Sequence, residues 1–246
     1  MINILVPIAG QSIFFENSEY KYPKPLIEIG KKPMIEWVIN NFNQIKEEKK
    51  YIFIVNKQNC IKYHLDDTLK LLTDNNCEII QIDHETKGAA CSCLMAIQYI
   101  NNDKELIITN GDQIIDTDLN KVLTYFRKKD ADGGVICFES VHPKWSYVRL
   151  DMNNKIIETA EKRPLSKEAI AGFYYFKKGK DFVNAAMKSI KKNSSVDGLY
   201  FIAPVYNELV LDNKYLITYK IDGNKYNNFY SPQRIEEFEK GLSFRN

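Results

Sequence analysis

Residues 4–10 read Ile4-Leu5-Val6-Pro7-Ile8-Ala9-Gly10, a short apolar run that stops at a glycine. A strand of a parallel sheet is buried on both faces, so it reads as continuous apolar sequence rather than as an alternation. The run therefore predicts a buried strand that leaves the sheet at Gly10. Similar runs follow at residues 51–55, 78–82 and 106–110.

Segments with helical patterns separate these strands. Residues 33–45 place apolar side chains at helical spacing, namely Met34, Ile35, Val38, Ile39 and Phe42. Residues 61–72 and 88–99 are interpreted as two further helices. This alternation predicts an α/β fold with a mixed, mostly parallel central sheet and helices on both faces. Ligands of such folds bind beyond the carboxyl ends of the strands, where the loop at Gly10 falls.

The second half of the chain has a different pattern. Strands are expected at residues 134–139, 147–151, 155–159 and 171–176, and the turn Met152-Asn153-Asn154 indicates an antiparallel hairpin. Helices are expected at residues 180–191, 202–210 and 232–240. We expect a single domain over residues 1–246, with a nucleotide-binding half at about 1–125 and an acceptor-binding half at about 126–246.

The composition excludes several classes of protein. The 246 residues include 34 basic and 32 acidic side chains, a net charge of +2, which argues against a nucleic-acid binder. Apolar stretches are too short for a membrane span. Five cysteines without a CxxC pair indicate reduced thiols, so we expect a cytoplasmic protein. The sequence leaves open whether the chain forms a homo-oligomer.

Two segments near the N-terminus could bind phosphate. The loop Ala9-Gly10-Gln11-Ser12 follows a predicted strand and has small residues, so its backbone N–H groups could approach a phosphate. Lys24 lies between Pro23 and Pro25, which restrict the backbone on either side. A lysine held in this way can stabilise the charge that develops during phosphoryl or nucleotidyl transfer.

Acidic residues supply candidate metal and acceptor sites. Asp112 follows the predicted strand at residues 106–110, where a carboxylate could hold Mg²⁺ against phosphate oxygens. Asp116 and Asp118 lie nearby and remain alternative ligands. Further along, Glu161-Lys162 ends a predicted strand and could place a carboxylate and an ammonium group on a phosphorylated acceptor.

Taken together, these segments resemble the nucleotidylyltransferases that activate sugar phosphates and phosphocholine. The motifs follow the family's order along the chain: Pro7 to Gly10, Pro23 to Ile27, Gly30 to Ile35, Gly88 to Ala90, Asn110 to Asp112, Glu161-Lys162, Ala171 to Tyr174 and Ser231-Pro232. The resemblance implies a nucleotide-diphospho-sugar transferase fold of the GT-A, Rossmann-like type. It also implies a reaction in which an NTP and a phosphorylated acceptor give an NDP-linked product and pyrophosphate.

The resemblance assigns roles to particular residues. Lys24, Asp112 and Lys162 would be catalytic, and Asp112 would hold Mg²⁺ or Mn²⁺. The nucleotide would contact the phosphate loop, the base-pocket segment and two of the catalytic residues: Ala9, Gly10, Gln11, Ser12, Lys24, Thr86, Gly88, Ala89 and Asp112. The acceptor would contact Tyr147, Glu161, Lys162 and Gly172.

Three positions depart from the family's pattern. Phe14 stands where the phosphate loop usually carries an arginine, so another cation such as Lys21 would have to replace it. Asn228 stands where a second metal-binding aspartate is usual. Leu199 stands where the family usually has a glutamate that binds sugar hydroxyls. The loss of that glutamate argues against an ordinary hexose acceptor.

A narrower resemblance concerns the substrates. Thr86 to Cys91, Gly111 to Gln113 and Pro204 to Leu209 resemble a branch found among capsule and lipopolysaccharide genes. Its cytidylyltransferases begin capsular phosphoramidate synthesis by joining CMP from CTP to the amide phosphate of L-glutamine phosphate. Two alternatives remain: a sugar-1-phosphate nucleotidylyltransferase that uses dTTP, UTP or GTP, and a catalytically inactive regulatory protein of the same fold.

Overall fold

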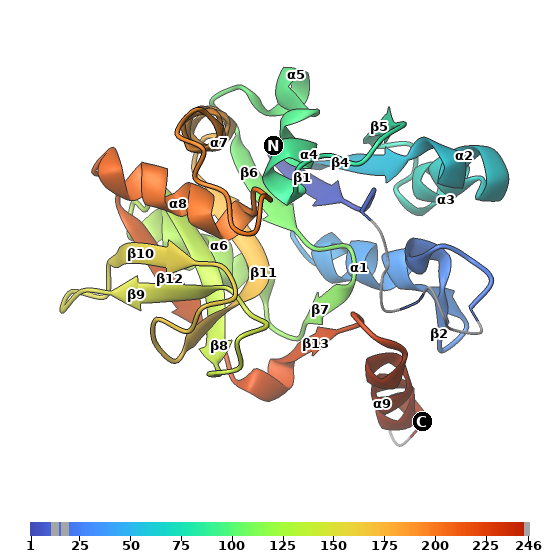
Figure 1. The fold of residues 1–246 in the computed structure, drawn as a ribbon. Coiled ribbons are helices and arrows are strands. Elements are labelled where there is room, and N and C mark those ends of the chain that lie inside the picture. The colour runs from blue at the N-terminus through green and yellow to red at the C-terminus, as the bar shows by residue number, and fades with distance from the viewer. Residues whose placement is uncertain (11–14, 16–19, 244–246) are drawn as a thin grey trace.

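The computed structural model describes residues 1–10, 15 and 20–243. Its centre is a sheet in which β1 (Ile2–Pro7) lies between β4 (Lys49–Asn56) and β6 (Glu105–Thr109), parallel to both. On the far side of β4, β5 (Cys77–Ile82) is also parallel. The four apolar runs of the first half therefore form the predicted parallel strands, in the order β6-β1-β4-β5 (Figure 1).

The second half extends this sheet with antiparallel strands. β11 (Glu168–Phe176) pairs antiparallel with β6, and β8 (Gly133–Glu139) pairs antiparallel with β11. β9 (Tyr147–Leu150) and β10 (Ile156–Ala160) form the predicted antiparallel hairpin beside them. The result is one mixed sheet of nine strands, so the predicted fold class is confirmed.

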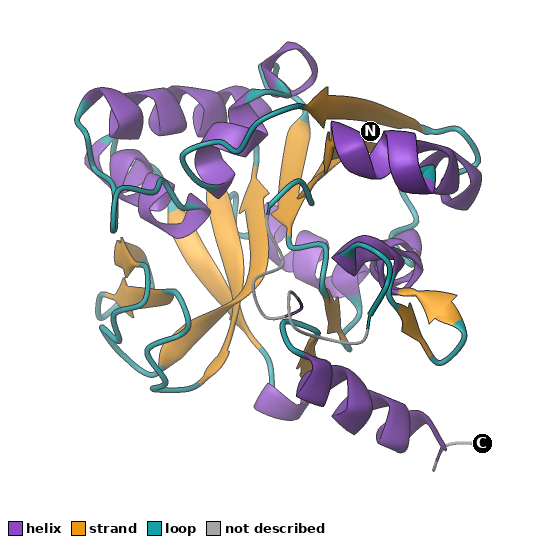
Figure 2. Cartoon of the chain, turned by 45° about the vertical axis from the view of Figure 1, so that its right-hand side comes forward, coloured by secondary structure: helices purple, strands orange, loops and turns teal. Residues whose placement is uncertain are grey.

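Helices cover both faces of this sheet (Figure 2). Ile4 and Val6 of β1 belong to one core cluster, with α1 (Met34–Asn43) and α6 (Leu119–Lys128). Leu5 belongs to the opposite cluster, with α7 (Gly179–Lys191) and α8 (Ile202–Leu211). Because alternate residues of a strand point to opposite faces, β1 supplies apolar side chains to both cores, and its polar residue Asn3 is buried and donates to the Tyr99 carbonyl oxygen.

Two predicted helices are each divided in two. The segment 61–72 forms α2 (Lys57–Tyr63) and α3 (Leu65–Leu72), which are separated at His64 by a left-handed backbone with φ 53°. The segment 88–99 forms α4 (Ala89–Leu94) and α5 (Ile97–Ile100). Apolar periodicity continues across both breaks, so it did not reveal them.

Several elements were not predicted. The helix α6 carries Leu119, Val122, Leu123 and Phe126 at helical spacing, a signal that the sequence did contain. β12 (Leu216–Lys220) adds a parallel strand beside β8. Residues 24–33 form a 3-10 turn, η2 (Lys24–Leu26), followed by the short hairpin of β2 (Glu28–Ile29) and β3 (Lys32–Pro33).

A separate two-stranded sheet brings the C-terminal segment to the edge of the central sheet. β7 (Gln113–Ile115) follows β6, and it pairs antiparallel with β13 (Tyr226–Asn228). The 3-10 turn η3 (Gly223–Lys225) precedes β13, and α9 (Pro232–Ser243) follows it. Within the described part of the chain, none of the helices is both long and apolar enough to cross a membrane.

Candidate active site

A cleft opens at the carboxyl ends of β1 and β6, as the fold predicts. A hollow of about 470 Å³ there is lined by residues that follow these two strands, by the η2 turn and by one residue before α8: Pro7, Ile8, Gly10, Lys24, Pro25, Asn110, Gly111, Asp112 and Phe201. Three of the predicted site residues, Gly10, Lys24 and Asp112, therefore share one cavity. Residues 11, 12 and 14, also named from the sequence, lie outside the described residues.

Lys24 and Asp112 form an ion pair in this cleft. Lys24 Nζ lies 2.5 Å from Asp112 Oδ2, and the two side chains are 18% and 23% exposed. Pro23, with φ −62° and ψ 151°, precedes the η2 turn, and buried Pro25 lies within it, so the backbone on both sides of Lys24 is fixed. Lys24, which the sequence predicts to be held by its flanking prolines, therefore pairs with Asp112, the predicted metal ligand.

The two alternative metal ligands lie elsewhere. Asp118 accepts a hydrogen bond from the backbone N–H of Asn120 and caps α6. Asp116 is exposed, and both aspartates line another hollow, of about 870 Å³, between α1, β7 and α9. Neither carboxylate lines the cavity that contains Lys24, so Asp112 is the metal-ligand candidate that the geometry supports.

The position of the usual second metal ligand lies beside Asp112. Asn228 pairs with Gln113 across the β7–β13 sheet, and the N–H of the next residue donates to the carbonyl oxygen of Asp112 at 2.7 Å. Asn228 Oδ1 is buried without a hydrogen-bond partner among the residues that the structure describes. A buried oxygen of this kind suits a hard cation such as Mg²⁺, so Asp112 and Asn228 fit the metal that the family uses.

A second hollow of about 190 Å³ adjoins the first and shares Asn110 and Phe201 with it. Its other walls come from α4, from the segment before β9, from the end of β10, from β11 and from the start of β13: Ala89, Lys144, Trp145, Ser146, Glu161, Ile170, Gly172, Tyr174, Ile202 and Tyr226. The predicted acceptor residues Glu161 and Gly172 are both here. Ala89, predicted to bind nucleotide, also lines this second hollow.

Glu161 is the carboxylate of this second hollow. Burial raises the pKa of its side chain above the ordinary value, although a hydrogen bond from the Ser146 hydroxyl and the nearby Lys162 act in the opposite direction. Lys162 itself is exposed, has a left-handed backbone with φ 53°, and places Nζ 5.3 Å from the centre of the Phe201 ring. Lys162 therefore lies beside the ring that borders both hollows, but it lines neither of them.

Tyr147 does not line the cleft. Its side chain is completely buried in the core, and its hydroxyl donates to the carbonyl oxygen of His142 at 2.7 Å. The neighbouring Trp145 and Ser146 face the cavity instead. The expectation that Tyr147 contacts the acceptor is therefore wrong, because this side chain packs in the core.

The predicted base-pocket segment is fixed by backbone contacts. Gly88 has φ +104°, and a Cβ there would lie 2.5 Å from the carbonyl oxygen of Tyr200. The Thr86 hydroxyl donates to the Gly88 carbonyl oxygen at 3.0 Å. The N–H of Ala90 donates to the Tyr200 carbonyl oxygen at 2.9 Å. These contacts join the segment to the residue that precedes Phe201 on the floor of the cleft.

Gly172 gives a stability prediction. It has φ +59°, and a Cβ would lie 2.2 Å from Gln113 Oε1 and 2.3 Å from Asn110 Nδ2. Gly172→Ala should therefore lower the free energy of unfolding by roughly 2–4 kcal/mol, measured by urea denaturation. Gly198→Ala is the matched control, because Gly198 has φ +76° with open space around it. Equal losses for both variants would contradict a role for the contact with Gln113.

Several residues of the cleft were not predicted. Lys144, Trp145 and Tyr230 gather at one end of the second hollow, where Lys144 Nζ donates to the Tyr230 hydroxyl at 3.0 Å. Phe201 separates the two hollows. Lys144-Trp145 does precede a predicted strand, but nothing local in the sequence indicates that Tyr230, 86 positions away, would meet it.

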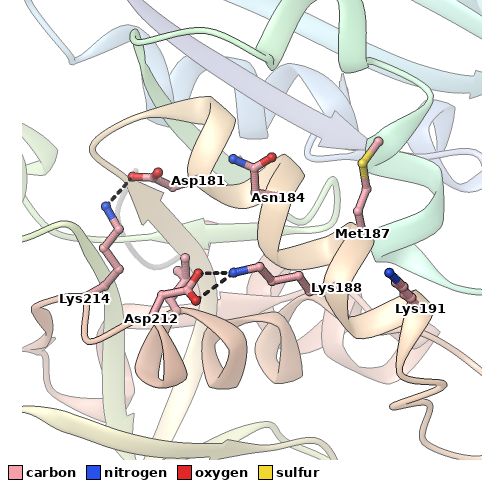
Figure 3. A pocket seen from close by; sticks show the side chains of 8 residues that line it. Asp181, Asn184, Met187, Lys188, Lys191, Asp212 and Lys214 are labelled. Atoms are coloured by element: carbon pink, nitrogen blue, oxygen red, sulfur yellow. Dashed lines mark hydrogen bonds and ion pairs between the residues drawn. The ribbon is translucent and has the colours of Figure 1, made fainter.

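Another hollow, of about 340 Å³, lies between α7 and α8 (Figure 3). Its charged groups are largely paired, because Lys188 binds Asp212 at 2.6 Å and Lys214 binds Asp181 at 3.3 Å. It contains none of the predicted site residues. The predicted catalytic residues Lys24 and Asp112 thus lie in the cleft and not in this hollow.

The chain matches the nucleotidyl transferase family over residues 19–218, a range that includes Lys24, Asp112 and Lys162. The chain belongs to this family. Its members are enzymes that transfer a nucleoside monophosphate. Among curated relatives, the bifunctional protein GlmU of Methanococcus aeolicus is 26% identical over 72% of this chain, and the match covers 44% of that relative. The chain thus spans less than half the length of such relatives.

Solved structures support the fold of this nucleotidyl transferase family member. A nucleoside-diphosphate-sugar pyrophosphorylase from Vibrio cholerae RC9 has a TM-score of 0.83 and 22% identity, over 96% of this chain and 99% of that one. A UDP-glucose pyrophosphorylase complexed with UDP-glucose has a TM-score of 0.78 and 19% identity over the whole of both chains. At these identities the likeness establishes the fold and not the substrates.

Proposed function

We propose that this chain transfers CMP from CTP to a small phosphorylated acceptor and releases pyrophosphate. The acceptor that fits best is L-glutamine phosphate, with CDP-L-glutamine as product, in capsular polysaccharide modification. A phosphate oxygen of the acceptor attacks the α-phosphorus of CTP, and the bond from that phosphorus to the pyrophosphate oxygen breaks. The cytoplasmic location expected from the sequence remains part of this proposal.

The first hollow supplies the groups that such a transfer needs. Lys24 can move from Asp112 to the triphosphate and balance the charge on the leaving pyrophosphate. Lys162, beside the ring of Phe201, can reach towards the cleft and hold the phosphate of the acceptor in line with the α-phosphorus. Mg²⁺, held by Asp112 and the oxygen of Asn228, would supply further positive charge to the phosphates.

The observation that carries the choice of acceptor is the chemistry of the second hollow. Its charged groups are one ammonium, of Lys144, and one carboxylate, of Glu161, among aromatic walls. Leu199, where the family has a sugar-gripping glutamate, is 39% exposed and forms backbone hydrogen bonds with Val196 in a turn. The Leu199 side chain offers no hydrogen bond, so a hexose would lose the contact that the family's glutamate makes with its hydroxyl groups.

A second candidate is a sugar-1-phosphate nucleotidylyltransferase that uses dTTP, UTP or GTP. The similarity to GlmU and to nucleotide-sugar pyrophosphorylases favours it. Buried Gln113, which donates to the Gly172 carbonyl oxygen at 2.9 Å, and Asn110 still supply some polar groups near the acceptor hollow.

Kinetics with a panel of substrates test the proposal. Five NTPs, namely CTP, UTP, dTTP, GTP and ATP, are combined with L-glutamine phosphate, phosphocholine and glucose-1-phosphate, with Mg²⁺ and pyrophosphate detection. We expect CTP with L-glutamine phosphate to give the highest kcat/KM. Efficient turnover of glucose-1-phosphate with dTTP or UTP would overturn the proposed acceptor. No pyrophosphate from any pair would favour the inactive regulatory protein.

Glu161 gives a prediction about pH. Burial raises its pKa, so the folded protein holds this proton more tightly than the unfolded chain does. The stability of the wild type should therefore decrease as the pH rises from the ordinary pKa of the carboxyl through the raised one. Glu161→Gln should melt at a higher temperature than the wild type at pH 8, with the difference shrinking towards pH 4. A constant difference at all pH values would contradict this assignment.

A further inference from the structure

Lys144 is the cation of the second hollow, and it is held in place by aromatic rings. The side chain is half-buried and belongs to the segment between β8 and β9. Its Nζ lies 4.5 Å from the ring centres of both Trp145 and Tyr230, and it donates to the Tyr230 hydroxyl. Cation–π contacts and this hydrogen bond restrict the ammonium to one position beside the cavity.

The charge of Lys144 is not neutralised by the described residues. No carboxylate among residues 1–10, 15 and 20–243 lies within 4.0 Å of its Nζ. The rings orient the ammonium but carry no net charge. The ammonium does lower the pKa of the Tyr230 hydroxyl through its hydrogen bond. A half-buried cation without a counter-ion favours the binding of an anionic group.

A carboxylate occupies another wall of the same hollow. Glu161 follows β10 and accepts a hydrogen bond from Ser146, which belongs to the same segment as Lys144. Its only nearby cation is Lys162, with which it forms no ion pair within 4.0 Å in the described structure. Tyr174 and Tyr226 also line this hollow. The described lining residues therefore include one positive and one negative group, together with aromatic rings.

We propose that Lys144 is a specificity-determining residue that pairs with a carboxylate of the acceptor, while Glu161 pairs with its ammonium group. An α-amino acid carries these two charges on one carbon, so it can satisfy both walls at once. This inference rests on the proposed function and assigns the α-carboxylate of L-glutamine phosphate to Lys144. Lys24 and Lys162 then bind the phosphates. Lys24, Lys144 and Lys162 each have a separate anionic partner in this arrangement.

Three acceptors test the contributions of the carboxylate and of the ammonium group separately. The first is L-glutamine phosphate, the second is its analogue without the carboxylate, 4-aminobutanamide phosphate, and the third is its analogue without the ammonium, glutaramate phosphate. The wild type should prefer the first over either analogue by roughly 10–100-fold in kcat/KM, the range for a hydrogen bond to a charged group. Lys144→Met should lose the preference over 4-aminobutanamide phosphate and keep the other. Glu161→Gln should show the opposite pattern.

Lys167→Met is the matched control. Lys167 is exposed on the segment between β10 and β11 and pairs with Glu139, so its loss should leave both preferences unchanged. Unchanged preferences in Lys144→Met, with a protein that melts like the wild type, would overturn the inference. Equal loss of both preferences would show a general effect on the shape of the hollow, which also overturns it.

A binding measurement separates this inference from the proposed function. Ligand-detected NMR with CTP present compares unphosphorylated L-glutamine with 4-aminobutanamide. The wild type should bind L-glutamine more tightly, and Lys144→Met should bind the two equally, whether or not the wild type turns over the phosphate. If the wild type transfers no nucleotide to L-glutamine phosphate, the proposed function fails alone. Equal binding of both ligands by the wild type overturns the role of Lys144.

Discussion

Asp112→Asn should abolish nucleotidyl transfer and leave the fold intact. The carboxylate follows the central strand β6 and lines the cleft with Lys24, and the N–H of Phe229 donates to the Asp112 carbonyl oxygen. Loss of a metal-holding charge costs several kcal/mol of transition-state stabilisation, a decrease in kcat on the order of 10³-fold. Steady-state kinetics at saturating Mg²⁺ and CTP provide the measurement.

The stability of Asp112→Asn should change little. Its ion pair with Lys24 is partly exposed, and such pairs contribute up to about 1 kcal/mol. The melting temperature should therefore shift by roughly 4 °C at most. Asp116→Asn, at an exposed carboxylate that lines a different hollow, is the control and should keep its activity. Near wild-type activity of Asp112→Asn would show that another residue holds the metal.

Lys24→Ala should lower kcat/KM by roughly 10²–10³-fold, the effect of losing one preorganised electrostatic contact. Pro23 and Pro25 restrict the backbone that carries this side chain, which lines the cleft and pairs with Asp112. Lys32→Ala removes a lysine eight positions away that pairs with Glu36 on the surface, and it should change the rate less than threefold.

The Lys24→Ala variant also has a readout that is independent of turnover. The ammonium of Lys24 pairs with the carboxylate of Asp112, so the lysine should compete with a divalent cation for this group. Removal of the lysine should lower the Kd for Mn²⁺ several-fold, measured by electron paramagnetic resonance without nucleotide. A loss of activity under threefold, with an unchanged Mn²⁺ Kd, would show that Lys24 only shapes the loop.

Much of the central sheet could be predicted from local pattern. Apolar runs identify strands that are buried on both faces, and β1, β4 and β6 are such strands, whereas β5 lies at the edge of the sheet and is only partly buried. The prolines around Lys24 restrict backbone angles directly, so the fixed position of this lysine was also predictable. The helix breaks at His64 and before α5 could not be predicted, because the apolar spacing continues through them.

The sequence by itself determined the strand–helix alternation, the loop at Gly10 and the position of Asp112 after a central strand, because each depends on neighbouring residues. Only the tertiary structure decided which distant groups meet. Lys24 contacts Asp112, which lies 88 positions further along the chain, and Lys144 contacts Tyr230, which lies 86 positions further along. Those contacts depend on the register of β11 and on the pairing of β7 with β13, which local periodicity does not specify. The same pairing places Asn228 opposite Gln113, the residue after Asp112, where the sequence alone showed only a missing aspartate.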